Sequence, residues 1–120
     1  MADLIAFLRA RLDEDEALVP APESWTAFDV NEPTGTRRVD VDHSFERVVA
    51  CTRSWRGLHI ARHDPARVLR EVEAKRRALV RCEEELMAGM ERLTHFIRQT
   101  LWEMTLPYAD HPDYREEWRP

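Results

Sequence analysis

The sequence has little glycine, little cysteine and no long hydrophobic run. With three glycines among 120 residues, it contains no glycine-rich phosphate loop, and neither GxGxxG nor GKS/T occurs. No apolar stretch approaches the roughly 18–20 residues of a membrane span, and no signal-peptide pattern opens the chain. These absences favour a cytoplasmic protein that has no membrane segment.

The two cysteines and the histidines give little support for catalysis or metal binding. Cys51 and Cys82 form no CxxC pair, and without a secretion signal such cysteines are mostly free thiols. A nucleophilic set of Cys51, His59 and Asp64 would lack a glycine-containing oxyanion turn. His59 and His63 have metal-ligand spacing on a helix, but further ligands are missing. We expect no enzyme activity, no metal and no cofactor.

The charges are divided into blocks, although the net charge is only −5. Residues 53–81 carry nine basic and three acidic side chains, whereas residues 1–32 and 82–120 are both strongly acidic. We interpret this mainly as acidic elements folding beside a basic one. An overall pI near 5.5 argues against nucleic acid as a partner, because non-specific affinity comes from neutralising phosphates. A compact anionic ligand is less affected by that objection.

The first 20 residues have the pattern of a helix that ends before Pro20 and Pro22. Asp3 is the expected N-cap, and Arg11 and Asp15 form an expected i,i+4 pair on the solvent side. One stripe of the helix is apolar at helical spacing, and it contains Leu4, Ile5, Leu8 and Leu12.

Residues 24–52 predict a small antiparallel sheet. The segments 24–30 and 36–42 are rich in strand residues, and residues 31–35 contain the Asn, Pro and Gly of a turn. Residues 45–52 fit either a third strand or a helix. We favour the strand, because two strands alone are marginally stable.

Residues 54–106 read as helical, with Asp64 as an N-cap and Pro65 in the first helical position. A seven-residue apolar series then predicts one of two outcomes. Either the helix breaks near Gly89, or it continues and pairs with another chain, and the heptad spacing favours pairing. Aromatic residues in the Pro-rich tail, 107–120, are expected to pin it to the rest of the chain. The heptad series is Val72, Leu79, Leu86, Leu93 and Thr100.

Two stretches, and the opening helix, resemble a known family. The stretches are HIARHDPARVLREVEAKRR, which begins at His59, and LPYADHPDYREEW, which begins at Leu106; the opening LIAFLRARLDEDE is also similar. They resemble an uncharacterised family of short actinobacterial and actinophage proteins. The resemblance implies an origin in phages or mobile elements, and it implies no activity. Many members carry a cysteine-rich insert suited to zinc, whereas residues 81–92 contain one cysteine here.

A basic face is the candidate binding site for an anion. A salt-bridged exposed helix is its simplest interpretation. The alternative is a site in which guanidinium groups bind phosphate and an aromatic ring stacks on a base. The candidate residues are Arg62, Arg67, Arg70, Arg76, Arg77 and Trp55.

The residues together predict a single α+β domain spanning 1–120, with an N-terminal helix, a sheet of two or three strands and a long C-terminal helical segment. We expect a non-enzymatic interaction module that forms a homodimer or a higher oligomer. The alternative function is a phage counter-defence protein that sequesters a small anionic nucleotide signal or inhibits a host protein.

Overall fold

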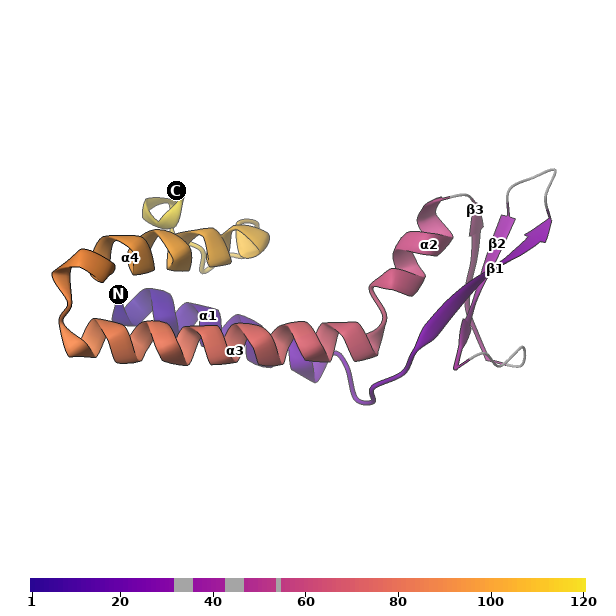
Figure 1. Ribbon diagram of the computed structural model, residues 1–120. Helices are drawn as coiled ribbons and strands as arrows, with labels where there is room; N and C mark the ends of the chain where they lie inside the picture. Colours follow the sequence, from indigo (N-terminus) through magenta and orange to yellow (C-terminus); the bar gives the residue numbers. More distant parts are fainter. Residues whose placement is uncertain (32–35, 43–46, 54) are drawn as a thin grey trace. The chain divides into compact units, whose positions relative to one another are not determined.

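The computed structural model describes residues 1–31, 36–42, 47–53 and 55–120, and it confirms the predicted α+β class (Figure 1). The expected turn over residues 31–35 falls largely outside the described residues, as does Phe45. The elements in chain order are α1 (Ala2–Ala17), β1 (Trp25–Asn31), β2 (Thr36–Val41), β3 (Val48–Arg53), α2 (Trp55–Arg62), α3 (Pro65–Ala88), α4 (Glu91–Thr105) and the short 3-10 helices η2 (Leu106–Tyr108) and η3 (Glu116–Trp118).

The chain divides into two compact units. One, which we call the helical unit, comprises Met1–Ala17 and Val72–Pro120; the other, the sheet unit, comprises Leu18–Glu71. Helix α3 contributes residues to both units. The expectation that the 120 residues form one domain stays a prediction.

The sheet unit is a three-stranded antiparallel sheet in the order β1-β2-β3. Trp25 pairs with Val41 at one end of β1, and Thr36 pairs with Arg53 across β2 and β3. The third strand resolves the ambiguity of residues 45–52 in favour of the strand, for the part from Val48 onward. The central strand β2 has the most protected residues, as expected for a strand paired on both sides, and these are Val39, Asp40 and Val41.

Helix α2 packs against all three strands of this sheet. The packing is close at Gly57, which is buried. A Cβ atom there would lie 2.8 Å from Cβ of Arg37 on β2, so only glycine lets the helix approach the sheet this closely. The side of α2 that faces away from the sheet therefore carries its large side chains into solvent.

Asp64 has the capping role that the sequence predicts, and it has a second role as well. One carboxylate oxygen accepts the backbone N–H of Arg67 at 2.8 Å, which caps α3. The other accepts the backbone N–H of Trp25 at 3.2 Å. One carboxylate thus joins the start of β1 to the start of α3 within the sheet unit.

The helical unit has a core made by α1, α3, α4 and η3. Four residues of α1 meet one residue of α3, two of α4 and one of η3, and all eight are buried. This core uses the apolar stripe predicted for the first helix. Its members are Leu4, Ile5, Phe7, Leu8, Leu79, Ile97, Leu101 and Trp118.

The long C-terminal helix breaks at Gly89, so the continuous helix favoured by the heptad spacing is wrong for this chain. Gly89 has φ +69°, and α4 begins two residues later. The physical reason is that part of the heptad stripe is covered within the same chain, because Leu79 is core and Leu86 packs against it. A left-handed glycine is the usual end of a helix.

Two local predictions about α1 are also wrong. The helix begins at Ala2, so Asp3 lies in its first turn, where it pairs with Arg115 at 3.0 Å instead of capping. Arg11 does not face solvent beside Asp15. Its side chain is only 7% exposed, and its surroundings are described below.

Replacing Gly89 by alanine should destabilise the protein by about 1–2 kcal/mol, because an L-residue at this φ brings its Cβ against the backbone. No atom lies within 4 Å of the added Cβ, so the cost is conformational. Gly89→Asn should cost less, because asparagine tolerates this conformation. Urea unfolding of the three proteins measures the order. Equal stability of the alanine variant and the parent would contradict the left-handed conformation assigned to Gly89.

Candidate functional site

The exposed side of α2 carries a row of three rings, Trp55, His59 and His63, which we call the α2 ladder. Positions 55, 59 and 63 are four apart, so they follow one face of the helix and the turn after it. The ring centroids of Trp55 and His59 are 6.1 Å apart, and those of His59 and His63 are 4.4 Å apart. Trp55 is 63% exposed, and the guanidinium of Arg56 lies 5.4 Å from its ring centroid.

Three of the arginine candidates lie in the sheet unit with this ladder. Arg67 pairs with Glu71 at 2.7 Å, as an exposed i,i+4 pair on α3. Arg62 and Arg70 are exposed, and neither has an acidic partner among the residues that the structure describes. These two arginines are therefore the remaining candidates for an anionic ligand in the sheet unit.

The other two candidates, Arg76 and Arg77, belong to the helical unit and are paired. Arg76 lies 2.6 Å from both Asp13 and Glu16 of α1, and the hydrogen bonds to Glu16 and Asp13 raise the pKa of the guanidinium. Arg77 pairs with Glu73 along α3. For Arg76, the interpretation of the charge blocks as acidic elements folded beside basic ones is confirmed.

The helical unit has an apolar groove between α1 and α3, which we call the α1–α3 groove. It encloses about 370 Å³. Arg9 and Glu83, which also line the groove, form an ion pair that joins α1 to α3 at its rim. Met87 is 88% exposed, and Met90 and Phe96 are also exposed nearby in the sequence. The groove is lined by Met1, Ala2, Ile5, Ala6, Arg9, Glu83, Leu86 and Met87.

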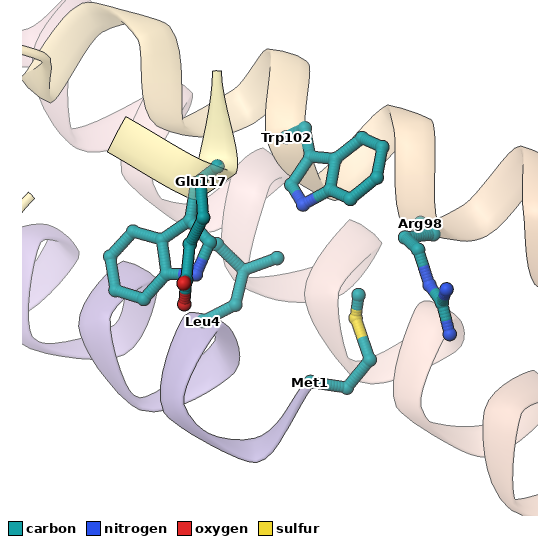
Figure 2. Close-up of a pocket in the computed structure, with 6 residues that line it drawn as sticks. Met1, Leu4, Arg98, Trp102 and Glu117 are labelled. Atoms are coloured by element: carbon teal, nitrogen blue, oxygen red, sulfur yellow. The ribbon is translucent and has the colours of Figure 1, made fainter. Parts of the chain in front are cut away.

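A second cavity of about 250 Å³ lies between α1, α4 and η3 (Figure 2). Trp102 and Arg98, one helical turn apart on α4, line it together with Trp118 of η3. Leu4 and Trp118 also belong to the core. The cavity is thus an opening at the edge of the core rather than a separate polar site.

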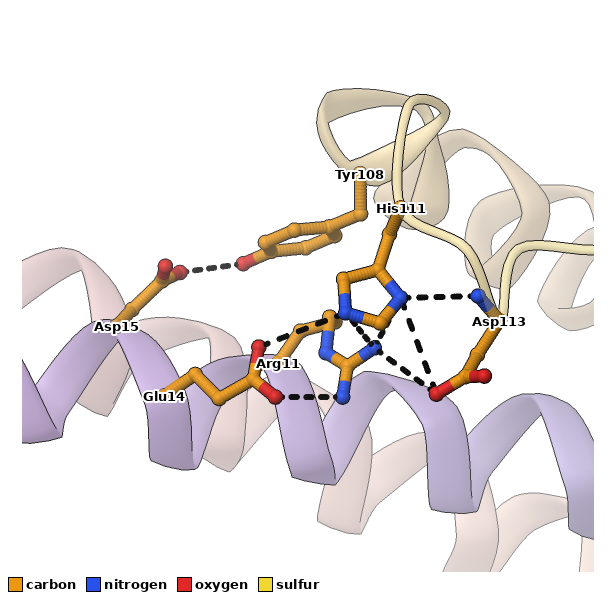
Figure 3. Close-up of polar contacts among 6 residues, drawn as sticks. All are labelled: Arg11, Glu14, Asp15, Tyr108, His111 and Asp113. Carbon is orange, nitrogen blue, oxygen red and sulfur yellow. Dashed lines mark hydrogen bonds and ion pairs between the residues drawn. The ribbon is translucent and has the colours of Figure 1, made fainter.

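A polar cluster joins the C-terminal tail to α1 (Figure 3). Nη1 of Arg11 donates to Nδ1 of His111 at 2.5 Å, and Nη2 donates to Glu14 at 2.8 Å. The backbone N–H of Asp113 also donates to Nδ1 of His111, at 3.1 Å. Nη1 of Arg11 also lies 2.7 Å from Nε2 of His111, so one guanidinium nitrogen contacts both ring nitrogens.

Aromatic rings from the tail complete this joint around Phe7. Its ring centroid lies 5.0 Å from that of Trp118 and 6.2 Å from that of Tyr114, and Tyr108 is 6.4 Å away. The hydroxyl of Tyr108 donates to Asp15 at 2.7 Å. The prediction that the tail aromatics pin the tail to the rest of the chain is confirmed.

The sequence analysis missed the roles of Arg11 and His111. Arg11 looked like a solvent-facing helix residue, because its i+4 neighbour Asp15 offered an obvious partner. Its place on α1 is one turn after Phe7, and the guanidinium lies 5.0 Å from the Phe7 ring centroid. The LPYADHPDYREEW stretch was the available signal, because its three aromatic rings favour packing against the rest of the chain.

The described residues contain no group of three or more His, Cys, Asp or Glu side chains placed to hold a metal ion. Cys51 is exposed and Cys82 is half-buried, and both are free thiols, as expected. Among the described helices, none has the length and apolar character needed to cross a membrane.

Fold and surface together define a small α+β protein with an exposed apolar groove and an aromatic, basic helix face. The chain belongs to a family of unknown function (DUF6221), whose model matches residues 1–120. The predicted membership of an uncharacterised family is therefore confirmed. No curated protein and no solved structure matches the chain.

Phe7→Ala should destabilise the helical unit by about 3–5 kcal/mol, because it removes a buried ring at the centre of an aromatic cluster. Trp55→Ala is the matched control, since it removes a larger ring that is mostly exposed, and it should cost less than about 0.5 kcal/mol. Urea unfolding followed by circular dichroism measures both. Similar costs for the two variants would show that the tail is not part of the core.

Cys82 should react with a thiol reagent more slowly than Cys51 at pH 8. Burial raises the pKa of the Cys82 thiol, and the charge of Arg81 opposes this only in part, so the reactive thiolate is scarce. The Cys51→Ser and Cys82→Ser variants separate the two rates in an absorbance assay. A faster reaction at Cys82 would contradict the core contact of its side chain.

Proposed function

We propose that this protein is a non-enzymatic interaction module that associates with a second copy of itself through the α1–α3 groove. The observation that carries the proposal is the apolar lining of this groove, where Met87 is 88% exposed. Large exposed apolar surfaces on small proteins mark interaction sites. Methionine suits such surfaces, because its flexible thioether adapts to a partner.

A second copy fits this groove because the charges around it are self-complementary. A twofold interface places the same patch on both partners, so each patch must supply both halves of every pair. The rim carries Arg9 and Glu83, and next in the sequence are Glu84 and Glu85, which have no basic partner among the described residues. Arg92, at the start of α4, likewise has no acidic partner there.

Sequestration of a small nucleotide by all five arginines is less well supported. Arg76 and Arg77 are committed to acidic partners in the helical unit, whereas Arg62, Arg67 and Arg70 belong to the sheet unit. Binding of a host protein would use the same groove as self-association. The mass of the purified protein alone distinguishes self-association from binding of a host protein, because only self-association gives a dimer without the host protein.

The absence of catalysis is proposed on chemical grounds. A cysteine nucleophile needs a base within hydrogen-bond reach. Cys51 makes no hydrogen bond to a described base, and the thiol of Cys82 has a raised pKa. Both ring nitrogens of His111 contact Nη1 of Arg11, in the contact between the tail and α1.

The Met87→Glu variant should be monomeric under conditions in which the parent protein is dimeric. A charge placed on the lining of the groove would be buried without a partner in the interface. Light scattering at about 100 µM should give twice the 14.2 kDa chain mass for the parent and the chain mass for the variant. Circular dichroism should be unchanged, since Met87 is exposed.

Leu18→Glu is the matched control, because Leu18 is 82% exposed but belongs to the sheet unit. It should leave the mass at the dimer value. A parent protein that is monomeric at 100 µM, or a dimer that survives Met87→Glu, would contradict self-association through this groove.

A further inference from the structure

We propose that the α2 ladder and the arginines near it in the sequence form a binding face for single-stranded nucleic acid. This inference goes beyond self-association and uses the other unit of the chain. Its first support is the ladder itself. A tryptophan that is 63% exposed and two histidines in line with it offer ring surface to solvent, and rings of this kind stack on the bases of a single strand.

The second support is the local balance of charge. Within the described part of the sheet unit, every acidic side chain already has a partner. Those partners are arginines or backbone N–H groups, and the acids are Glu23, Asp29, Asp40, Asp42, Asp64 and Glu71.

Three arginines lie near the ladder in the sequence. Arg56, Arg62 and Arg70 have no acidic partner among the described residues, and Arg56 contacts only the ring of Trp55. Guanidinium groups bind phosphate in a bidentate manner. The pI describes the whole chain, whereas residues 18–71 carry eight acidic and eight basic side chains and have no net charge.

The shape of the face favours a strand over a single nucleotide. The α2 ladder runs along a helix, where positions four apart are separated by about 6 Å. The three rings follow one another along the helix, so one base would gain one stacking contact only. A strand places successive bases and phosphates along the row, and its affinity adds up from several weak contacts.

The test is fluorescence anisotropy with a labelled twenty-residue oligothymidylate at 50 mM salt. Trp55→Ala should weaken binding by about 5- to 150-fold, the range expected for loss of one stacked base. Phe96→Ala is the matched control, because it removes a ring that is 67% exposed in the helical unit, and it should leave the affinity unchanged. Equal losses in both variants would overturn the proposal.

Salt dependence tests the arginines separately. Contacts from Arg56, Arg62 and Arg70 should give a slope of about −2 in a plot of log affinity against log salt, at about 0.7 per phosphate of a single strand. Arg62→Ala should make the slope less negative by about 0.7, whereas Arg92→Ala in the helical unit should not change it. An unchanged slope in Arg62→Ala would contradict phosphate binding at this face.

Two further arms define the ligand. A duplex of the same length should bind more weakly, because its bases are not free to stack, and millimolar mononucleotide should not displace the strand. Equal binding of the duplex, displacement by mononucleotide or no binding at 100 µM protein would each overturn the assignment. The Met87→Glu variant should keep its affinity for the strand, so failure of self-association and failure of this proposal are distinguishable.

Discussion

The contact between Phe7 and the rings of the C-terminal tail is the interaction on which the helical unit depends. A helix of 16 residues and a tail with only 3-10 turns have little stability of their own. Around Phe7, the tail supplies Tyr108, Tyr114 and Trp118 as edge-on or tilted neighbours, and this is the geometry that aromatic pairs prefer. The first and last segments of the chain thereby close one core.

This constraint explains why Arg11 is buried. It lies one turn after Phe7, beneath the tail, so its guanidinium needs hydrogen-bond acceptors there. Nδ1 of His111 and the carboxylate of Glu14 supply them. The guanidinium of Arg11 thereby links His111 of the tail to α1.

The same closure accounts for the break at Gly89. Once α1 covers Leu79 and Leu86, a straight continuation of α3 would leave Ile97 and Leu101 without a partner. The left-handed glycine turns the chain back, and both residues enter the core. Apolar side chains that the closure leaves outside, Met87 above all, are those on which the proposed self-association depends.

Local signals predicted much of the fold. These signals each depend on a few neighbouring residues. They are the Asp64-Pro65 start of α3, the alternation in β2, and the ends of helices at Pro20 and Gly89. What escaped prediction depends on residues far apart in the chain. The partner of Arg11 is 100 positions away. Part of the heptad series is covered by α1, at the other end of the chain.

The candidate site was predicted less completely than the fold. Spacing alone identified Trp55 and the arginines, but it gave no sign of which cations are neutralised. Arg76 and Arg62 look alike in the sequence, and only the fold places Asp13 and Glu16 beside Arg76. The row formed by Trp55, His59 and His63 emerges because Gly57 holds the opposite side of α2 against the sheet.

Hydrogen exchange in a chain shortened to end at Leu106 tests the central claim most directly. If the tail completes the core, the amides of Leu4–Leu12 should lose most of their protection, because α1 loses the rings around Phe7. The amides of β2 in the sheet unit serve as the internal reference and should keep theirs. Undiminished protection of α1 in the shortened chain would contradict the account.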